Sequence, residues 1–322
     1  MNQGVKRMQV DRDQLMRDGF LVLREMVAPD ELDAMRASYD TIIERQGGDD
    51  WLGSGGAQPR CQISPFLDES VANAAEIWLG ENTLGVANQL ISCPGRAGCS
   101  EMWVMCNPLV DHGPANWHRD IHPIDMAPMH LLQEDLRENG PRYVQWNIPL
   151  YDDDVLWVVR GSHLRLNSDE ENAQLEKDDQ APLPGSEAVA LKAGDGVVYI
   201  NVLLHWGSDY SSKPRRTLHG GHALHTLDPS RGSDRFLSGE AQGKFESFRQ
   251  QSAAGMDATE AALRAAAAGD AGAYGAALDQ LEPGIGDAGK LVLSVYLAKL
   301  SMFIRVHHRG AWAGYPAVLF GA

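Results

Sequence analysis

The feature that most constrains this fold is the motif Trp117-His118-Arg119-Asp120, read together with a distant histidine, His205. His118 and Asp120 are two residues apart, so on a β-strand their side chains point to the same side. His205 follows 87 positions after His118, at the end of the apolar run 196–204. The pattern predicts a fold in which distant strands bring two imidazoles and a carboxylate to one metal.

The residue types indicate which metal this is. Two histidines and one carboxylate on one face of a metal leave other positions open, as in non-heme Fe(II) oxygenases. Arg216 lies eleven residues after His205, past the turn 211–214. On a returning strand we expect its guanidinium beside the metal, where it can hold a carboxylate in two parallel bonds. Arg215 would face the opposite side and takes this role if the register differs by one.

These residues resemble a known family. The spacing His-x-Asp…His…Arg is similar to that of the phytanoyl-CoA dioxygenase (PhyH) superfamily of Fe(II)/2-oxoglutarate oxygenases. Flanking segments follow in the family's order. Residues 18–24 resemble its opening strand, 28–32 the start of its first long helix, 156–163 its Gly-Ser-His turn, and 194–196 the turn before the distal histidine. The resemblance covers about residues 11–226.

The resemblance implies an activity and its cofactors. It implies Fe(II) held by His118, Asp120 and His205, with 2-oxoglutarate as cosubstrate and O2 as oxidant. It also implies that Arg216 pairs with the distal carboxylate of 2-oxoglutarate. The expected reaction hydroxylates a small organic metabolite while 2-oxoglutarate gives succinate and CO2. Related halogenases have a small residue in place of the carboxylate, so Asp120 favours hydroxylation over halogenation.

Other functions stay open at this point. The same centre can perform desaturation, epoxidation or cyclisation in natural-product biosynthesis. A jelly-roll binding protein that has lost turnover would keep the same pocket. Zinc hydrolysis uses similar ligands, but the sequence places no general base beside the metal.

Further polar residues are candidates for the cavity. Gln145 and Asn147 share one face of the strand expected at 143–150, where they can hydrogen-bond the cosubstrate or substrate; an exterior sheet face is the alternative. His122 follows the metal motif by two strand positions and is a candidate substrate contact, and His222 has the parity of Arg216. Tyr199, Asn201 and Leu203 precede His205 by even numbers of residues on the same predicted strand, so we expect them to face the cavity as His205 does.

The predicted elements indicate the fold class. After N-terminal helices, the last at about 69–91, strands are expected at 100–107, 143–150, 155–159, 188–191, 197–204 and 216–224. Residues 47–60 are expected as a mobile loop and 167–184 as a solvated acidic loop. The pattern predicts a mainly β chain with helical cover (α+β). Its core is a double-stranded β-helix (jelly roll, cupin-like) with N-terminal and C-terminal helices.

A change in composition near residue 228 divides the chain. It predicts a jelly-roll oxygenase domain, 1–226, and a helical C-terminal extension, 227–322, packed on the core. Residues 287–308 are expected as a helix that is apolar around much of its circumference and therefore buried on two sides. The alternatives for this tail are a lid, a brace on the outer sheet, or a homodimer surface.

The net charge of −16 bears on partners. From Ser230 onward nine basic and nine acidic side chains cancel, so all the excess negative charge lies in the first 230 residues. Because nucleic-acid binding rests on neutralising phosphates, this balance argues against it. No apolar run reaches the roughly 20 residues that cross a bilayer, and no signal core follows Met1. We therefore expect a cytoplasmic enzyme with a small-molecule substrate and no membrane partner.

Overall fold

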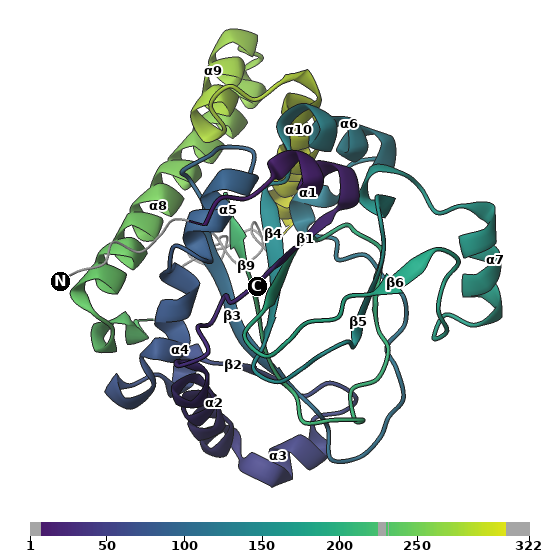
Figure 1. Cartoon of the computed structure of the whole chain (residues 1–322). Helices are drawn as coiled ribbons and strands as arrows, with labels where there is room; N and C mark the ends of the chain where they lie inside the picture. The colour runs from purple at the N-terminus through teal and green to yellow at the C-terminus, as the bar shows by residue number, and fades with distance from the viewer. Residues whose placement is uncertain (1–7, 225–229, 231, 307–322) are drawn as a thin grey trace.

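Two antiparallel sheets form the centre of the computed structural model, which describes residues 8–224, 230 and 232–306 (Figure 1). The larger sheet has the strand order β1-β7-β4-β9-β3-β2 and the smaller one β6-β5-β8. The strands are β1 Phe20–Leu23, β2 Arg60–Gln62, β3 Gly98–Cys106, β4 Tyr143–Pro149, β5 Leu156–Val159, β6 Ser186–Ala188, β7 Gly196–Ile200, β8 His205–Gly207 and β9 Arg216–Ala223. The predicted mainly β core with helical cover is confirmed.

Helices cover the sheets at both ends of the chain. On the N-terminal side these are α1 Arg12–Asp18, α2 Leu32–Gln46, α3 Gly48–Ser54, α4 Asn73–Glu76 and α5 Leu84–Leu90. Later in the chain come α6 Met129–Asn139, α7 Asp169–Lys177, α8 Gly239–Ala268, α9 Ala271–Leu281 and α10 Asp287–Val306. Short 3-10 turns are η1 Ser64–Phe66, η2 Glu69–Val71, η3 Ile77–Leu79, η4 Pro123–Asp125, η5 Ser162–Leu164 and η6 Ser233–Phe236. Figure 1 shows α2, α4, α5 and α8 on one side of the larger sheet and α7 beyond the smaller one.

The larger sheet separates an apolar layer from a polar cavity, because successive strand residues face opposite sides. On β4, Val144, Trp146 and Ile148 belong to the main core, which also contains side chains from the covering helices. Gln145 and Asn147 face the other way, towards the smaller sheet. One face of β4 therefore packs in the core, and the other face lines the candidate site.

Glycine is required where the first helix meets this core. Gly19 ends α1 in the left-handed conformation, with φ 88°. A Cβ atom there would lie 2.6 Å from His163 Nδ1 and 2.6 Å from a methyl group of Leu203. Both the backbone conformation and the close approach therefore exclude a larger side chain at the entry to β1.

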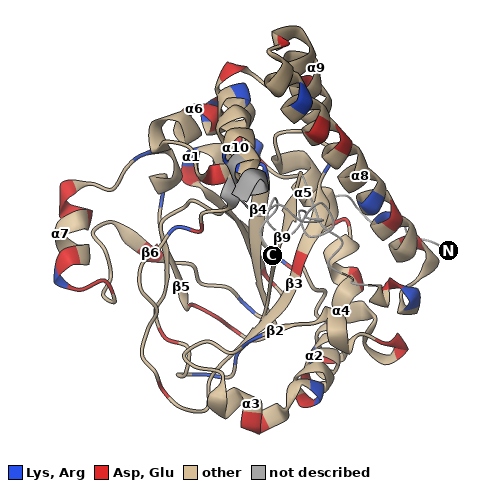
Figure 2. Cartoon of the chain, turned by 180° about the vertical axis from the view of Figure 1, so that it is seen from behind, with Lys and Arg blue, Asp and Glu red and all other residues tan. Residues whose placement is uncertain are grey.

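Several predicted segments differ from the structure, among them the strand 197–204, which ends at Ile200 of β7. The expected helix over 69–91 is broken into η2, α4, η3 and α5, because Gly80 is extended and the Thr83 hydroxyl donates to the Ile77 carbonyl instead of continuing a helix. The expected loop 47–60 contains α3. The acidic loop 167–184 contains α7, which begins with a capping box formed by Ser168 and Glu171. Figure 2 marks the acidic residues of α7 in red on the ribbon.

The C-terminal extension packs on the rest of the chain in two places. Phe245 and Phe248 of α8 are buried in the main core, and α9 packs along α8. The described part of the predicted helix 287–308 is α10, which packs against α6 and η4. The largely buried Arg142 joins the two parts, because its guanidinium pairs with Glu282 beyond α9 and with Asp135 of α6. Within the described residues, no helix is both long and apolar enough to span a membrane.

A buried histidine makes stability depend on pH. His222 accepts a hydrogen bond from Trp146 Nε1 at 3.0 Å through Nδ1, and its Nε2 lies 2.8 Å from the Trp78 carbonyl. Burial lowers the pKa of His222 to about 4. The unfolded chain binds a proton near the ordinary pKa of 6.5, so it gains protons before the folded chain does. We expect the free energy of unfolding to fall as pH drops from about 6.5 towards 4, by up to about 3 kcal/mol for this residue.

Denaturant titrations at several pH values measure this effect. The slope between these pH limits should be smaller in His222→Gln than in the wild type, while the exposed control His112→Gln should keep the wild-type slope. A His222→Gln variant with an unchanged slope would contradict the assignment.

Candidate metal centre

A reciprocal backbone pairing brings the two predicted histidine ligands together. The His118 amide donates to the His205 carbonyl and the His205 amide to the His118 carbonyl, both at 3.0 Å. The two rings lie 4.3 Å apart between centroids. Asp120 is fixed in the same way, because its amide donates to the Asn201 carbonyl at 3.0 Å. One ligand atom from each of His118, Asp120 and His205 lies within 4.8 Å of the others.

The hydrogen bonds of the rings leave the correct nitrogen for a metal. His118 Nδ1 lies 2.8 Å from the Asn116 carbonyl, and His205 Nδ1 lies 2.8 Å from the Leu203 carbonyl. A carbonyl accepts only, so each Nδ1 carries the proton and each Nε2 keeps its lone pair. Burial, and then the neighbouring His205, lower the pKa of His118, which keeps that imidazole neutral. The two histidines therefore fit a divalent metal.

The carboxylate of Asp120 completes the donor set. Burial alone would raise the pKa of Asp120, but the neighbouring His205, whose Nε2 lies 3.4 Å from Oδ2, and the hydrogen bond from Gln145 outweigh it and lower the pKa. Gln145 Nε2 donates to Asp120 Oδ2 at 2.9 Å and lies 2.8 Å from the Tyr199 hydroxyl. Asp120 is thus ionised and oriented. An anionic oxygen beside two imidazole Nε2 atoms is a donor set that suits Fe(II) and leaves open positions.

These ligands line a cavity of about 370 Å3 between the two sheets. Gln145, Asn147 and Tyr199, all placed in the cavity by strand parity, do line it. Asn147 Oδ1 lies 2.7 Å from His219 Nδ1. Further wall residues that strand parity had not singled out are Gln58, Arg60, Met105, Tyr210 and His219.

Arg216 does not face this cavity, contrary to expectation. Its Nε donates to Asp40 of α2 at 3.0 Å, on the helical side of the larger sheet. Arg215 lines the cavity instead, is 4% exposed, and donates from Nε to Asp153 Oδ2 at 2.8 Å. The register thus differs by one residue from the expected one.

The alternation along β9 explains this difference. Leu218 is buried in the main core on the helical side, and Arg216 is two residues before it, so both share that face. Thr217 and His219 share the opposite face with Arg215. His222, expected on the cavity side, follows Leu218 by four residues and lies on the helical side. The two apolar residues of β9, Leu218 and Ala223, have opposite parity, so the sequence of the strand does not indicate its register.

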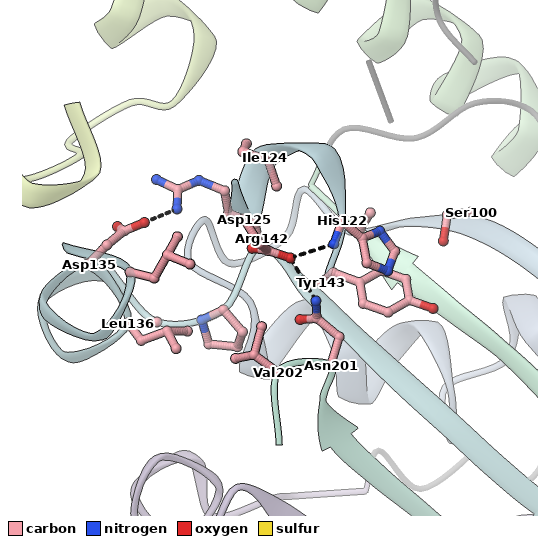
Figure 3. Close-up of a pocket in the computed structure, with 14 residues that line it drawn as sticks. Ser100, His122, Ile124, Asp125, Asp135, Leu136, Arg142, Tyr143, Asn201 and Val202 are labelled. Atoms are coloured by element: carbon pink, nitrogen blue, oxygen red, sulfur yellow. Dashed lines mark hydrogen bonds and ion pairs between the residues drawn. The ribbon is translucent and has the colours of Figure 1, made fainter. Parts of the chain in front are cut away.

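A second, smaller cavity of about 60 Å3 is lined in part by the turn that follows Asp120 in the sequence (Figure 3). His122 and Asn201 line it, whereas Leu203 packs between the sheets. Asn201 Nδ2 donates to the Asp120 carbonyl at 2.9 Å and to Asp125 Oδ2 at 2.7 Å. Asp125 also accepts from the His122 amide at 3.0 Å. This network ties the turn after the metal motif to the strand that precedes His205.

We expect Asn201→Ala to weaken metal binding about 10- to 100-fold, because it removes the side chain that holds the Asp120 backbone and leaves Asp125 buried without that donor. Titration with Mn(II) followed by electron paramagnetic resonance measures the affinity. The control Asn82→Ala removes a hydrogen bond to the distant Met26 carbonyl and should bind as the wild type does. Equal affinities in all three proteins would contradict a role for Asn201 in the site.

Comparisons with known proteins agree with this geometry. Residues 15–217 match the family described as phytanoyl-CoA dioxygenase (PhyH), so the chain belongs to this family. No curated protein matches the chain. Among solved structures it is similar to HygX from Streptomyces hygroscopicus, solved with nickel and 2-oxoglutarate bound. The identity is 16%, the TM-score is 0.50, and the match covers 71% of this chain and 100% of that chain.

Two further similarities are weaker. AviO1 from Streptomyces viridochromogenes Tue57 is 23% identical, with a TM-score of 0.46, over 67% of this chain and 96% of that chain. The epimerase SnoN, solved with Fe3+, alpha ketoglutarate and nogalamycin RO, is 15% identical, with a TM-score of 0.47, over 66% of this chain and 81% of that chain. The family membership makes the chain an iron- and 2-oxoglutarate-dependent oxygenase. The predicted enzyme class, with Fe(II), 2-oxoglutarate and O2, is confirmed at that level.

Proposed function

We propose that this enzyme hydroxylates a small organic molecule at the site formed by His118, Asp120 and His205. The observation that carries the proposal is the donor set itself, two imidazole Nε2 atoms and one carboxylate on the wall of the cavity between the sheets. Fe(II) held there, with 2-oxoglutarate, supplies the activation of O2. One oxygen atom is inserted into a substrate C–H bond, and the other enters succinate as CO2 leaves.

In this proposal, Arg215 takes the role expected of Arg216 and binds the distal carboxylate of 2-oxoglutarate. Its Nε is held by Asp153, and the Thr217 hydroxyl donates to the same oxygen of Asp153 at 2.9 Å. Burial alone raises the pKa of Asp153, but the charge and hydrogen bond of Arg215 outweigh this and lower it. The guanidinium is therefore fixed in direction, and its outer nitrogens can hold a carboxylate bidentately.

Gln145 and Asn147 also have roles in this proposal. Gln145 donates to the oxygen of Asp120 that lies nearer His205, so it limits how that carboxylate can turn. Asn147 lies on the same wall, and its side-chain oxygen faces His219. Both amides line the cavity that the ligands line, where they can contact the cosubstrate. Burial lowers the pKa of His219 to about 3, so this ring stays neutral beside them.

We expect His118→Ala, Asp120→Ala and His205→Ala each to abolish iron binding and turnover while the fold persists, because each removes one of three ligands from a site held by backbone pairing. Metal analysis, circular dichroism and O2-dependent succinate release measure these effects. The exposed His112→Ala serves as the control and should behave as the wild type. Wild-type turnover in any of the three ligand variants would refute the metal assignment.

We expect Arg215→Gln to weaken 2-oxoglutarate binding by on the order of 2–5 kcal/mol, because a charged partner is lost from a buried position. Arg216→Gln is the matched neighbour and should change the affinity little. Anaerobic titration of the Fe(II) enzyme with 2-oxoglutarate, followed by the charge-transfer absorption, gives both values. The thermal midpoint of each variant controls for loss of the Asp153 pair. If only Arg216→Gln weakens 2-oxoglutarate binding strongly, then Arg216 binds the distal carboxylate, as the sequence predicted.

Desaturation, epoxidation and cyclisation at the same centre are the alternative outcomes. Mass spectrometry of the product distinguishes them, since hydroxylation adds one oxygen atom and desaturation removes two hydrogen atoms. The cytoplasmic location and the absence of a nucleic-acid partner remain predictions. So does a homodimer through the C-terminal helices, for which Leu291 of α10 offers an exposed apolar side chain.

A further inference from the structure

The cavity reaches the edge of the larger sheet at β2, where it is lined by Arg60. Arg60 is paired with Met105 across β2 and β3, so the two side chains share one face of the sheet. Both line the cavity that contains His118, Asp120 and His205. The Arg60 side chain is exposed, so its guanidinium lies at the open edge of the cavity.

This guanidinium differs from its neighbours in having no partner. Arg215 pairs with Asp153, and Arg216 pairs with Asp40. The Arg60 side chain forms no hydrogen bond, ion pair or ring contact within the described part of the chain. The chain has 44 acidic and 28 basic side chains, so carboxylates are abundant. The charge of Arg60 acts on Glu101, where it opposes the burial that raises the pKa of that carboxyl, but no described carboxylate forms an ion pair with Arg60. An exposed cation kept open at a binding cavity is available to a ligand from outside.

The charge of Arg60 acts on the centre of the cavity. After burial, it is the next largest cause that lowers the pKa of His219, which lies on the wall near Gln145. His118, Asp120 and His205 line the same cavity as Arg60, so a ligand held by Arg60 would share that cavity with the metal ligands.

Two arginines, Arg215 and Arg60, line the cavity, but 2-oxoglutarate has only one distal carboxylate for them to bind. The carboxylate at the other end of 2-oxoglutarate lies at the metal in the proposed function, and Arg215, being deeply buried, suits the distal one. Arg60 is left over. Beside it on the same sheet face lies Trp103, which is paired with Gln62 of β2 and with His219 of β9. Trp103 is half-buried.

We propose that Arg60 binds an oxyanion of the primary substrate, a carboxylate or a phosphate ester, and thereby selects anionic small molecules. The planar guanidinium matches such a group through two parallel hydrogen bonds. The net charge of −16 repels anions at long range. The unpaired Arg60 guanidinium at the cavity edge attracts an anionic substrate at short range. This inference rests on the proposed function, because it concerns the substrate of the same site.

The test uses the full-length Fe(II) enzyme with 2-oxoglutarate and O2. The probes are small carboxylic acids and phosphate monoesters, each compared with its neutral amide or parent alcohol, and the readout is stimulation of succinate release. We expect stimulation by acids or phosphate esters and not by their neutral partners. Arg60→Gln should raise the KM for the stimulating anion about 10- to 100-fold, and Arg60→Lys should recover part of the loss. Arg264→Gln, an exposed arginine on α8, is the control.

Each other outcome is decisive. Equal stimulation by neutral partners, an unchanged KM in Arg60→Gln, or no stimulation by any anion overturns the proposal. If Arg60→Gln instead weakens the binding of the cosubstrate 2-oxoglutarate, the residue serves the cosubstrate and the proposal is also wrong. Failure of the proposed function is recognised separately, because the wild-type enzyme would then bind no Fe(II) or release no succinate when O2 is supplied.

Discussion

The two backbone hydrogen bonds between His118 and His205 hold the metal centre together. They join a segment outside any named strand to the start of β8, and β8 in turn pairs with β5 through His205 and Val158. Asp120 is attached by a third backbone bond, to the Asn201 carbonyl. All three ligands are therefore positioned by the main chain, so the geometry of the site depends on sheet register more than on the ligand side chains themselves.

The larger sheet makes this arrangement possible by keeping two environments apart. The apolar side chains of β4 and β9 face the covering helices, while the opposite faces carry Gln145, Asn147 and His219. His219 and His222 are three residues apart and point to opposite sides, yet burial lowers the pKa of both, to about 3 and about 4. Both rings are held neutral as members of hydrogen-bond networks, one beside the metal ligands and one inside the apolar layer.

The C-terminal extension lies outside the family match, which ends at residue 217, and yet it touches the loop of the metal site. Ile124 of η4 packs against the apolar cluster of α8, α9 and α10, and the Lys299 amine donates to the Met126 carbonyl. One residue further along from Ile124, Asp125 is bonded to Asn201, which holds Asp120. A segment outside the family match is thus linked through three residues to Asp120.

The sequence alone determined the ligand set, the sheet-based fold and the cavity face of β4. These follow from local rules: His118 and Asp120 are two apart on an extended segment, and Gln145 and Asn147 alternate with apolar residues. Only the tertiary structure decided between Arg215 and Arg216. Both faces of β9 are buried, so no consistent contrast between apolar and polar residues shows in the sequence. Nor could the sequence show that Arg60 stands across from Met105 at the cavity edge, because that pairing joins segments more than forty residues apart, and its register is set by the packing of the whole sheet.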